Sequence, residues 1–142
     1  GLTLALAESC TGGAISAHLV ETAGASEYFL GSIVVYSNHL KTKVLGADLI
    51  HGAVSHECAQ SLILKTLELT DASIAGAVTG IAGPLGGSEE KPVGTVFIGM
   101  GKKGEMPLVK ECHFEGDRMA VIQKTKDYFL EELLFFLQSE SY

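Results

Sequence analysis

The sequence predicts a single α/β domain whose sheet carries helices on both faces. Short apolar or β-branched runs alternate with segments in which apolar residues recur at helical spacing. Such alternation is typical of parallel strands that are joined by helices. Two further strand-like runs, at 93–99 and 108–114, flank a charged turn over 101–104, which predicts an antiparallel hairpin. We therefore expect a mixed sheet rather than a purely parallel one.

Apolar runs and turn residues define the elements of the first half of the chain. The predicted elements are a strand over 2–6, a helix from about 11 to 22, a strand over 29–36, a short helix through 41–45 and a helix after Ser55. Ser37 or Asn38 caps the short helix and Gly46 ends it. The apolar side of the helix after Ser55 consists of Ala59, Leu62, Ile63, Thr66 and Leu67.

The second half predicts a buried strand, the hairpin and a long last helix. The small apolar run 72–78 is bounded by turn residues, which predicts the buried strand. Asp117 caps the last helix, whose apolar side consists of Ile122, Thr125, Phe129, Leu133 and Phe136. The tail 133–137 is apolar nearly all round, which indicates either burial or a contact between copies of the chain.

Composition places the chain in the cytoplasm and excludes several classes of function. A chain of 142 residues is one domain by size, and no apolar run approaches the length of a membrane span. The net charge of −7 argues against nucleic-acid binding, which needs clustered lysine and arginine. Three cysteines, without the spacing of a metal site, are typical of free thiols in a reducing compartment.

The stretch from Ala7 to Gly13 is the first candidate site. It lies between a predicted strand and a predicted helix, and it holds two potential nucleophiles, Ser9 and Cys10. The free N–H groups at a helix start suit a phosphate, a carboxylate or the oxyanion of an acyl-transfer intermediate. The alternative is that Thr11 only caps a helix and that the glycines only permit the turn.

Three loops follow the carboxyl ends of predicted strands, which is where open α/β sheets bind their ligands. These loops gather Ser9, Cys10, Thr11, Tyr36, Lys41 and Thr79. They contain no His–Asp pair, so the candidate base is Lys41. A position in the first turn of a helix and partial burial beside Tyr36 both lower the pKa of a lysine, which lets it deprotonate a serine. The alternative is a solvated surface lysine.

Five ordered motifs carry a family resemblance that covers essentially the whole chain. They are Ala7-Glu8-Ser9-Cys10-Thr11-Gly12-Gly13, Tyr36-Ser37-Asn38-x-x-Lys41, Gly52-Ala53-Val54-Ser55, Thr79-Gly80-Ile81-Ala82-Gly83-Pro84 with Lys91-Pro92-Val93-Gly94-Thr95-Val96, and Gly116-Asp117-Arg118. The sequence resembles the C-terminal domain of competence/damage-inducible protein A, the nicotinamide-nucleotide amidase family. Several motifs in the right order are far more specific than one glycine-rich loop.

The resemblance implies a fold and an activity. The fold is a three-layer α/β/α sandwich with a mixed, mostly parallel sheet, usually self-associating, so a homo-oligomer is expected. The activity is hydrolysis of the carboxamide of nicotinamide mononucleotide (NMN) to nicotinic acid mononucleotide and ammonia, in pyridine nucleotide recycling. The family uses no metal or other cofactor, and its small-molecule partner is the substrate NMN. It normally begins with a helix before the first strand, which 1–142 lacks, and Leu85 stands where a small or polar residue is expected.

The resemblance also assigns roles to residues. Ser9 is the catalytic nucleophile, Lys41 the base and Tyr36 its partner, whereas Thr79 and Arg118 help to bind the substrate. Backbone N–H groups near Thr11, Gly12 and Gly13, or in the second glycine-rich loop that includes Gly80, stabilise the oxyanion. Arg118 or the free amides of a loop hold the phosphate.

Several alternatives stay open from the sequence. Cys10 is the stronger intrinsic nucleophile and a helix start lowers a thiol pKa, but we interpret it as a packing residue. Glu8 is an acid/base group, a ribose ligand or an anchor for the turn. His51, His56 and Cys58 match no usual zinc spacing, and Glu89 with Glu90 forms a charged loop tip rather than a Mg²⁺ site. The whole domain is an amidase, for NMN or another amide, or else a catalytically silent nucleotide-binding module with a regulatory or accessory role.

Overall fold

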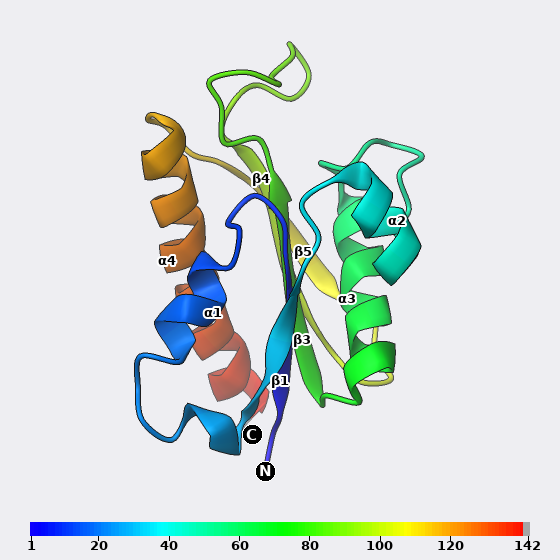
Figure 1. Cartoon of the computed structure of the whole chain (residues 1–142), viewed down its shortest axis with the longest axis vertical. Helices are drawn as coiled ribbons and strands as arrows, with labels where there is room; N and C mark the ends of the chain where they lie inside the picture. Colours follow the sequence, from blue (N-terminus) through cyan, green and yellow to red (C-terminus); the bar gives the residue numbers. More distant parts are fainter. Residues whose placement is uncertain (141–142) are drawn as a thin grey trace.

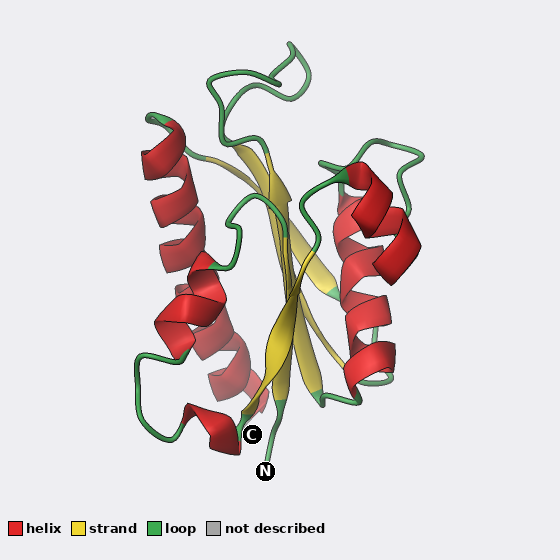
Figure 2. Cartoon of the chain, viewed as in Figure 1, coloured by secondary structure: helices red, strands yellow, loops and turns green. Residues whose placement is uncertain are grey.

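Five strands form one mixed sheet in the computed structural model, which describes residues 1–140 (Figures 1 and 2). The strands are β1 (Leu4–Glu8), β2 (Phe29–Val34), β3 (Ile74–Gly80), β4 (Thr95–Lys102) and β5 (Leu108–His113). They lie in the order β2-β1-β3-β4-β5. The first three strands are mutually parallel, whereas β4 runs antiparallel to β3 and β5 antiparallel to β4. The predicted α/β class with a mixed sheet is confirmed.

Helices cover both faces of the sheet and make three layers. The helices are α1 (Ala14–Leu19), α2 (Asn38–Leu45), α3 (His56–Thr70) and α4 (Arg118–Glu140), with a 3-10 turn, η1, over Ala25–Glu27. Figure 1 shows α1 and α4 on one side of the sheet and α2 and α3 on the other. Two separate clusters of buried apolar side chains, one on each face, form the core.

Side-chain size differs between the two faces, because successive residues of a strand point to opposite sides. Leu4 and Leu6 of β1 pack in the core that includes Phe129 of α4, whereas Ala75 and Ala77 of β3 pack in the α3 core. On the α4 face the strands therefore contribute large side chains, whereas on the α3 face the large side chains come mainly from the helix.

Glycines let both long helices approach the sheet closely. A Cβ at Gly76 of β3 would lie 2.4 Å from Cζ of Phe129, which is fully buried. On the opposite face, a Cβ at Gly99 or Gly101 of β4 would lie 3.0 Å from the side chain of Ile63 in α3. Each helix thus places a large side chain where the sheet has none.

Capping residues confirm the predicted start of two helices. The Ser37 hydroxyl accepts the N–H of Leu40 at 3.1 Å, and Gly46 ends α2 in a left-handed conformation. The Ser55 hydroxyl accepts the N–H of Cys58 at 3.1 Å and starts α3. The five residues predicted for the apolar side of α3, Ala59, Leu62, Ile63, Thr66 and Leu67, are all buried.

Several boundaries differ from the prediction. The strands β1, β3 and β4 each begin two residues later than expected. The first helix spans only Ala14–Leu19 rather than 11–22, and its start is fixed by Glu8 of β1, whose carboxylate accepts the first free N–H groups of the helix. The hairpin turn lies beyond Lys102 rather than at 101–104, because Gly101 pairs with Ala75 inside β4. The predicted Asp117 cap is confirmed, since its carboxylate accepts the N–H of Ala120 at 2.9 Å.

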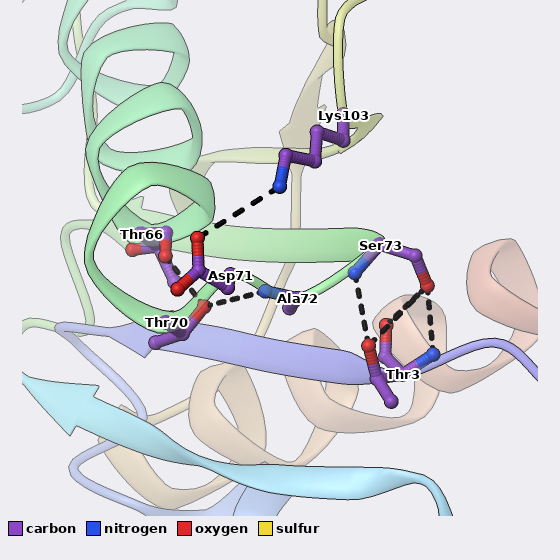
Figure 3. A network of polar contacts seen from close by, with 7 residues as sticks. All are labelled: Thr3, Thr66, Thr70, Asp71, Ala72, Ser73 and Lys103. Carbon is purple, nitrogen blue, oxygen red and sulfur yellow. Dashed lines mark hydrogen bonds and ion pairs between the residues drawn. The ribbon is translucent and has the colours of Figure 1, made fainter.

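A polar network ties the strands together at the amino-terminal edge of the sheet (Figure 3). Thr3 and Ser73, 70 residues apart, exchange backbone and side-chain hydrogen bonds just before β1 and β3. Beside them, the Thr70 hydroxyl accepts the N–H of Ala72 and donates to the Thr66 carbonyl. These hydrogen bonds join the segments that lead into β1 and β3 and so hold the two neighbouring strands together.

Candidate active site

A cavity of about 230 Å³ lies beyond the carboxyl ends of β1, β2 and β3. In Figure 1 this edge is at the top, where the turn after β1, the start of α2 and the loop over 81–94 meet. The cavity is lined by Ser9, Cys10, Tyr36, Asn38, Lys41, Ala53, Val54, Thr79, Gly80, Ala82 and Arg118. Of the predicted site residues, six line it together: Ser9, Tyr36, Lys41, Thr79, Gly80 and Arg118.

Glu8 builds the turn that carries Ser9. Its carboxylate is fully buried and accepts hydrogen bonds from the Thr11 hydroxyl at 2.7 Å and from the N–H groups of Ile15 at 3.0 Å and Ser16 at 2.9 Å. The Ser16 hydroxyl donates a further hydrogen bond to it. Gly13, the residue before α1, offers no side chain, so Glu8 satisfies the helix start from the neighbouring strand. Of the roles left open for Glu8, the structure favours the anchor.

Three predicted binding residues of that turn, Thr11, Gly12 and Gly13, lie outside the cavity lining. Thr11 is buried and its hydroxyl is donated to Glu8, whereas Gly12 and Gly13 adopt positive φ angles of 61° and 107°. The N–H of Gly12 donates to the Ser9 carbonyl and that of Ala14 to the Thr11 carbonyl. These glycines therefore shape the turn, and their amides are not all available to a ligand.

Lys41 is a buried cation at the base of the cavity. Its side chain is 3% exposed, and its Nζ donates to the backbone carbonyl of Tyr36 at 2.7 Å. Burial lowers the pKa of the Lys41 ammonium below its ordinary value of 10.5, because desolvation penalises the charged form. Within the described residues no carboxylate forms an ion pair with Lys41. The lysine is thus set to lose its proton more readily than a surface lysine.

Cys10 differs electrostatically from the sequence-based expectation. Burial raises the pKa of its thiol to about 12, and this outweighs the lowering by its own backbone N–H and by Lys41. The expected lowering by a helix start is therefore wrong for Cys10. The thiol is 7% exposed and belongs to the apolar core on the α4 face, in agreement with its interpretation as a packing residue.

Ser9 carries the other potential nucleophile of the turn. The residue is 5% exposed and lines the cavity, yet its hydroxyl makes no hydrogen bond with Lys41 or any other described residue. The lysine Nζ is held by the Tyr36 carbonyl instead. The serine hydroxyl and the lysine thus line one cavity without a hydrogen bond between them.

Arg118 joins three segments at the rim of the cavity. Its Nη1 donates to the Gly83 carbonyl at 2.6 Å and its Nη2 to the Tyr36 hydroxyl at 2.7 Å. The resemblance implied that Tyr36 is the partner of Lys41, whereas here its hydroxyl contacts Arg118. Thr79 donates its hydroxyl to the Ala53 carbonyl at 2.8 Å, which ties β3 to the segment before α3.

The charge of the cavity is opposite to that of the chain. Two cationic side chains, Lys41 and Arg118, line it and no aspartate or glutamate does, although the net charge of the chain is −7. Asn38 is a lining residue that the sequence reading missed as a contact; its position at the start of α2, one residue after the Ser37 cap, could have indicated it. Leu85 is 85% exposed and lies outside the lining.

Two further structural features concern metals and membranes. No group of three or more His, Cys, Asp or Glu side chains is arranged to hold a metal ion within residues 1–140. His56, a residue weighed as a metal ligand, instead packs edge-on against Phe97 at a centroid distance of 4.8 Å. None of the described helices combines the length and the apolar character that crossing a bilayer would require.

Fold and site together define an α/β sandwich domain that gathers a serine, a buried lysine and an arginine beyond its parallel strands. The chain belongs to the CinA family: the model of the CinA C-terminal domain matches residues 1–137. A CinA-like protein of Thermotoga sp. strain RQ2 is 45% identical over 140 residues, which are 96% of this chain and 34% of that protein. One of Citrifermentans bemidjiense is 51% identical over 122 residues, covering 83% of this chain and 29% of the relative.

Solved structures share the same architecture. The competence/damage inducible protein CihA from Agrobacterium tumefaciens superposes with a TM-score of 0.89 at 38% identity, covering 94% of this chain and 84% of that one. A CinA superfamily protein from Enterobacter cloacae gives a TM-score of 0.91 at 30% identity, covering 96% and 83%. The chain spans about a third of the length of the curated relatives it matches.

Proposed function

We propose that this domain hydrolyses the carboxamide of nicotinamide mononucleotide, releasing nicotinic acid mononucleotide and ammonia, with Ser9 as nucleophile and Lys41 as base. The observation that carries the proposal is the meeting of Ser9, Tyr36 and Lys41 in one cavity whose lysine is buried and has a lowered pKa. A module that only binds a nucleotide needs the glycine loops and Arg118 but has no use for a buried lysine beside a serine.

In the proposed reaction Lys41 acts alternately as a base and as an acid. The neutral amine takes the proton of the Ser9 hydroxyl while Oγ attacks the amide carbon, and the resulting ammonium returns a proton to the departing nitrogen. The C–N bond breaks, ammonia leaves, and an ester joins Ser9 to the nicotinoyl group. Water then attacks the ester carbon while Lys41 takes a proton from it. The ester C–O bond breaks, the Lys41 ammonium gives this proton to Ser9 Oγ, and the acid product is released.

The oxyanion of this reaction needs preorganised N–H donors close to Ser9. The amides of Gly12 and Ala14 are engaged with carbonyls of the turn. The amides of Cys10, Thr11 and Gly13 have no backbone acceptor within the described residues, and of these three residues only Cys10 lines the cavity, so we assign the oxyanion to the Cys10 amide. The hydrogen bonds of Glu8 to Thr11 and Ile15 hold the turn and thereby hold this donor in position.

An anionic substrate suits the charge of the cavity. Arg118 is the sole arginine of the chain and lies at the rim, with no carboxylate partner among the described residues. A guanidinium can bind a phosphate through two parallel hydrogen bonds. We therefore place the phosphate of the substrate at Arg118 and the carboxamide deeper in the cavity, beside Ser9.

The direct test measures ammonia release from nicotinamide mononucleotide by the wild type, Ser9→Ala and Cys10→Ala. We expect Ser9→Ala to lose activity by about a thousandfold or more and Cys10→Ala to keep most of it. Circular dichroism confirms that both variants are folded. Loss of activity in Cys10→Ala alone would make the cysteine the nucleophile.

One observation favours a second candidate, a nucleotide-binding module without turnover. Ser9 and Lys41 share no hydrogen bond in this arrangement, and the lysine is held by a carbonyl instead. The same experiment separates the two functions. A thermal shift with nicotinamide mononucleotide, in the absence of any ammonia release, would support the binding module and refute the amidase.

A further inference from the structure

Tyr36 links the two cations of the cavity through different atoms. Its backbone carbonyl accepts the hydrogen bond from Lys41 Nζ at 2.7 Å, and its side-chain hydroxyl accepts the one from Arg118 Nη2 at 2.7 Å. Arg118 and Tyr36 are 82 residues apart in the sequence, and they meet at the rim of the cavity. The residue that holds the proposed base is therefore also held by the proposed phosphate-binding residue.

The hydrogen bonds of Arg118 are weak compared with those it would make to an anion. Both partners, the Tyr36 phenol and the Gly83 carbonyl, are neutral. A charged acceptor such as a phosphate makes hydrogen bonds roughly twice as strong, and it competes for the same guanidinium fork. Tyr36 is 57% exposed, so little packing opposes a movement of its ring once its hydroxyl is released.

We infer that Arg118 and Tyr36 form a clasp that the phosphate of the substrate opens, and that the opening places the Tyr36 hydroxyl against the Lys41–Ser9 pair. This inference rests on the proposed amidase function and adds how that site distinguishes its substrate. The phosphate takes the guanidinium, the phenol turns into the cavity, and its hydroxyl orients the lysine amine toward Ser9. The distal anion thus controls the reacting groups as well as binding.

If the clasp exists, the presence of a phosphate on the substrate raises kcat and does not only lower KM. A substrate that lacks phosphate binds while the clasp is closed, so its chemical step stays slow even at saturation. If Arg118 only anchored the phosphate, a substrate without phosphate would have a higher KM and an unchanged kcat.

The kinetic test compares nicotinamide mononucleotide with the corresponding riboside, with and without added inorganic phosphate. For the wild type we expect kcat on the riboside to fall by about tenfold or more and inorganic phosphate to restore much of it. Tyr36→Phe is expected to lower kcat on the mononucleotide by about tenfold and to remove the response to phosphate. Tyr28→Phe is the matched control, because Tyr28 lies outside the cavity lining. Equal kcat values on both substrates, with only KM changed, would overturn the inference.

A binding measurement separates this inference from the proposed function. The chain has four tyrosines, so fluorotyrosine labelling gives few fluorine resonances, and Tyr36→Phe assigns the one from Tyr36. We expect inorganic phosphate to shift that resonance in the wild type and to leave it unchanged in Arg118→Lys, which keeps the charge without the fork. A shift without ammonia release would refute the amidase alone, whereas ammonia release without a shift would refute the clasp alone.

Discussion

Burial shifts the pKa values of the ionisable side chains around the cavity. The same loss of solvent lowers the pKa of Lys41 and raises that of Cys10 to about 12, because each group favours its neutral form. Cys58, whose pKa is also raised, to about 11, belongs to the core on the α3 face. Both thiols are thus held in their protonated form near neutral pH, while Lys41 loses its proton more readily than a surface lysine, in keeping with the proposed role of Ser9 as nucleophile.

The proposed role of Lys41 as base predicts a particular pH dependence. The rate of ammonia release is expected to rise with pH as the Lys41 ammonium loses its proton, around a pKa below 10.5. Lys41→Arg is expected to be inactive across the whole range, because a guanidinium stays protonated. A steady-state pH profile of both proteins checks this. An active Lys41→Arg variant would show that another group is the base.

The buried charge also predicts a stability effect. The pKa of Lys41 is lower in the folded than in the unfolded chain, so between the two values the unfolded chain binds more protons and stability rises with pH. Lys41→Met removes the cost of burying the ammonium near neutral pH. We expect the Tm difference between wild type and Lys41→Met to shift in favour of the wild type as pH rises toward 10.5. Thermal unfolding at several pH values measures it; a constant difference would contradict the lowered pKa.

Glu8 is the residue on which the turn depends most. Glu8→Ala leaves several buried donors without an acceptor, at about 1–3 kcal/mol each, so we expect a loss of at least about 3 kcal/mol in the free energy of unfolding. Glu21→Ala is the control, because Glu21 is a surface partner of His18 at 3.3 Å and is expected to matter by less than about 1 kcal/mol. Urea unfolding compares the two. Similar small losses would show that the carboxylate does not anchor α1.

At the scale of elements, the close approach of α4 to the sheet depends on one glycine. Phe129 is fully buried over Gly76 of β3, and α4 also carries Arg118 at its first position. The packing that places Phe129 therefore also places the guanidinium at the cavity rim. A helix seated further from the sheet would shift Arg118 relative to Tyr36.

Gly76→Ala tests this packing. The new methyl group would lie 2.4 Å from the Phe129 ring, so we expect a loss of about 1–3 kcal/mol in stability. Phe129→Leu in the same chain frees space, and we expect the double variant to lose less than the sum of the single variants. Chemical denaturation of the four proteins gives the interaction energy. Additive losses would show that the two positions do not contact each other.

At the scale of the whole molecule, the tail of α4 carries an unexplained apolar surface. For the tail 133–137 the sequence left burial and a contact between copies open. Leu133 is buried, whereas Leu134 and Phe135 are 60% and 67% exposed. An apolar cavity of about 180 Å³ lies beside Phe135 and Leu108 of β5, at the free edge of the sheet. Apolar surface of this kind is typical of a contact between copies of a chain.

Self-association through this surface is a testable prediction. We expect the wild type to form a homo-oligomer and Leu134→Glu/Phe135→Glu to be monomeric, because two carboxylates replace the apolar contact. Analytical ultracentrifugation gives the mass, and circular dichroism checks the fold. A monomeric wild type, or an oligomer that the double variant retains, would contradict the prediction.

Local patterns in the sequence determined the fold class, the order of the elements and the caps at Ser37, Ser55 and Asp117. A cap is a hydrogen bond to a residue three positions away, and apolar spacing reports directly which side of a helix is buried. The same patterns placed Ser9, Tyr36 and Lys41 at one edge of the sheet, because parallel strands end on the same side. The family membership is confirmed as well.

Only the tertiary structure decided how these residues act on one another. The anchoring role of Glu8, the short α1 and the raised pKa of Cys10 depend on burial between elements, which has no signature in the sequence around them. The contact of Arg118 with Tyr36 joins residues 82 positions apart. Hydrogen bonds and desolvation of this kind arise only after the helices have packed on the sheet, and they set the chemistry of the cavity.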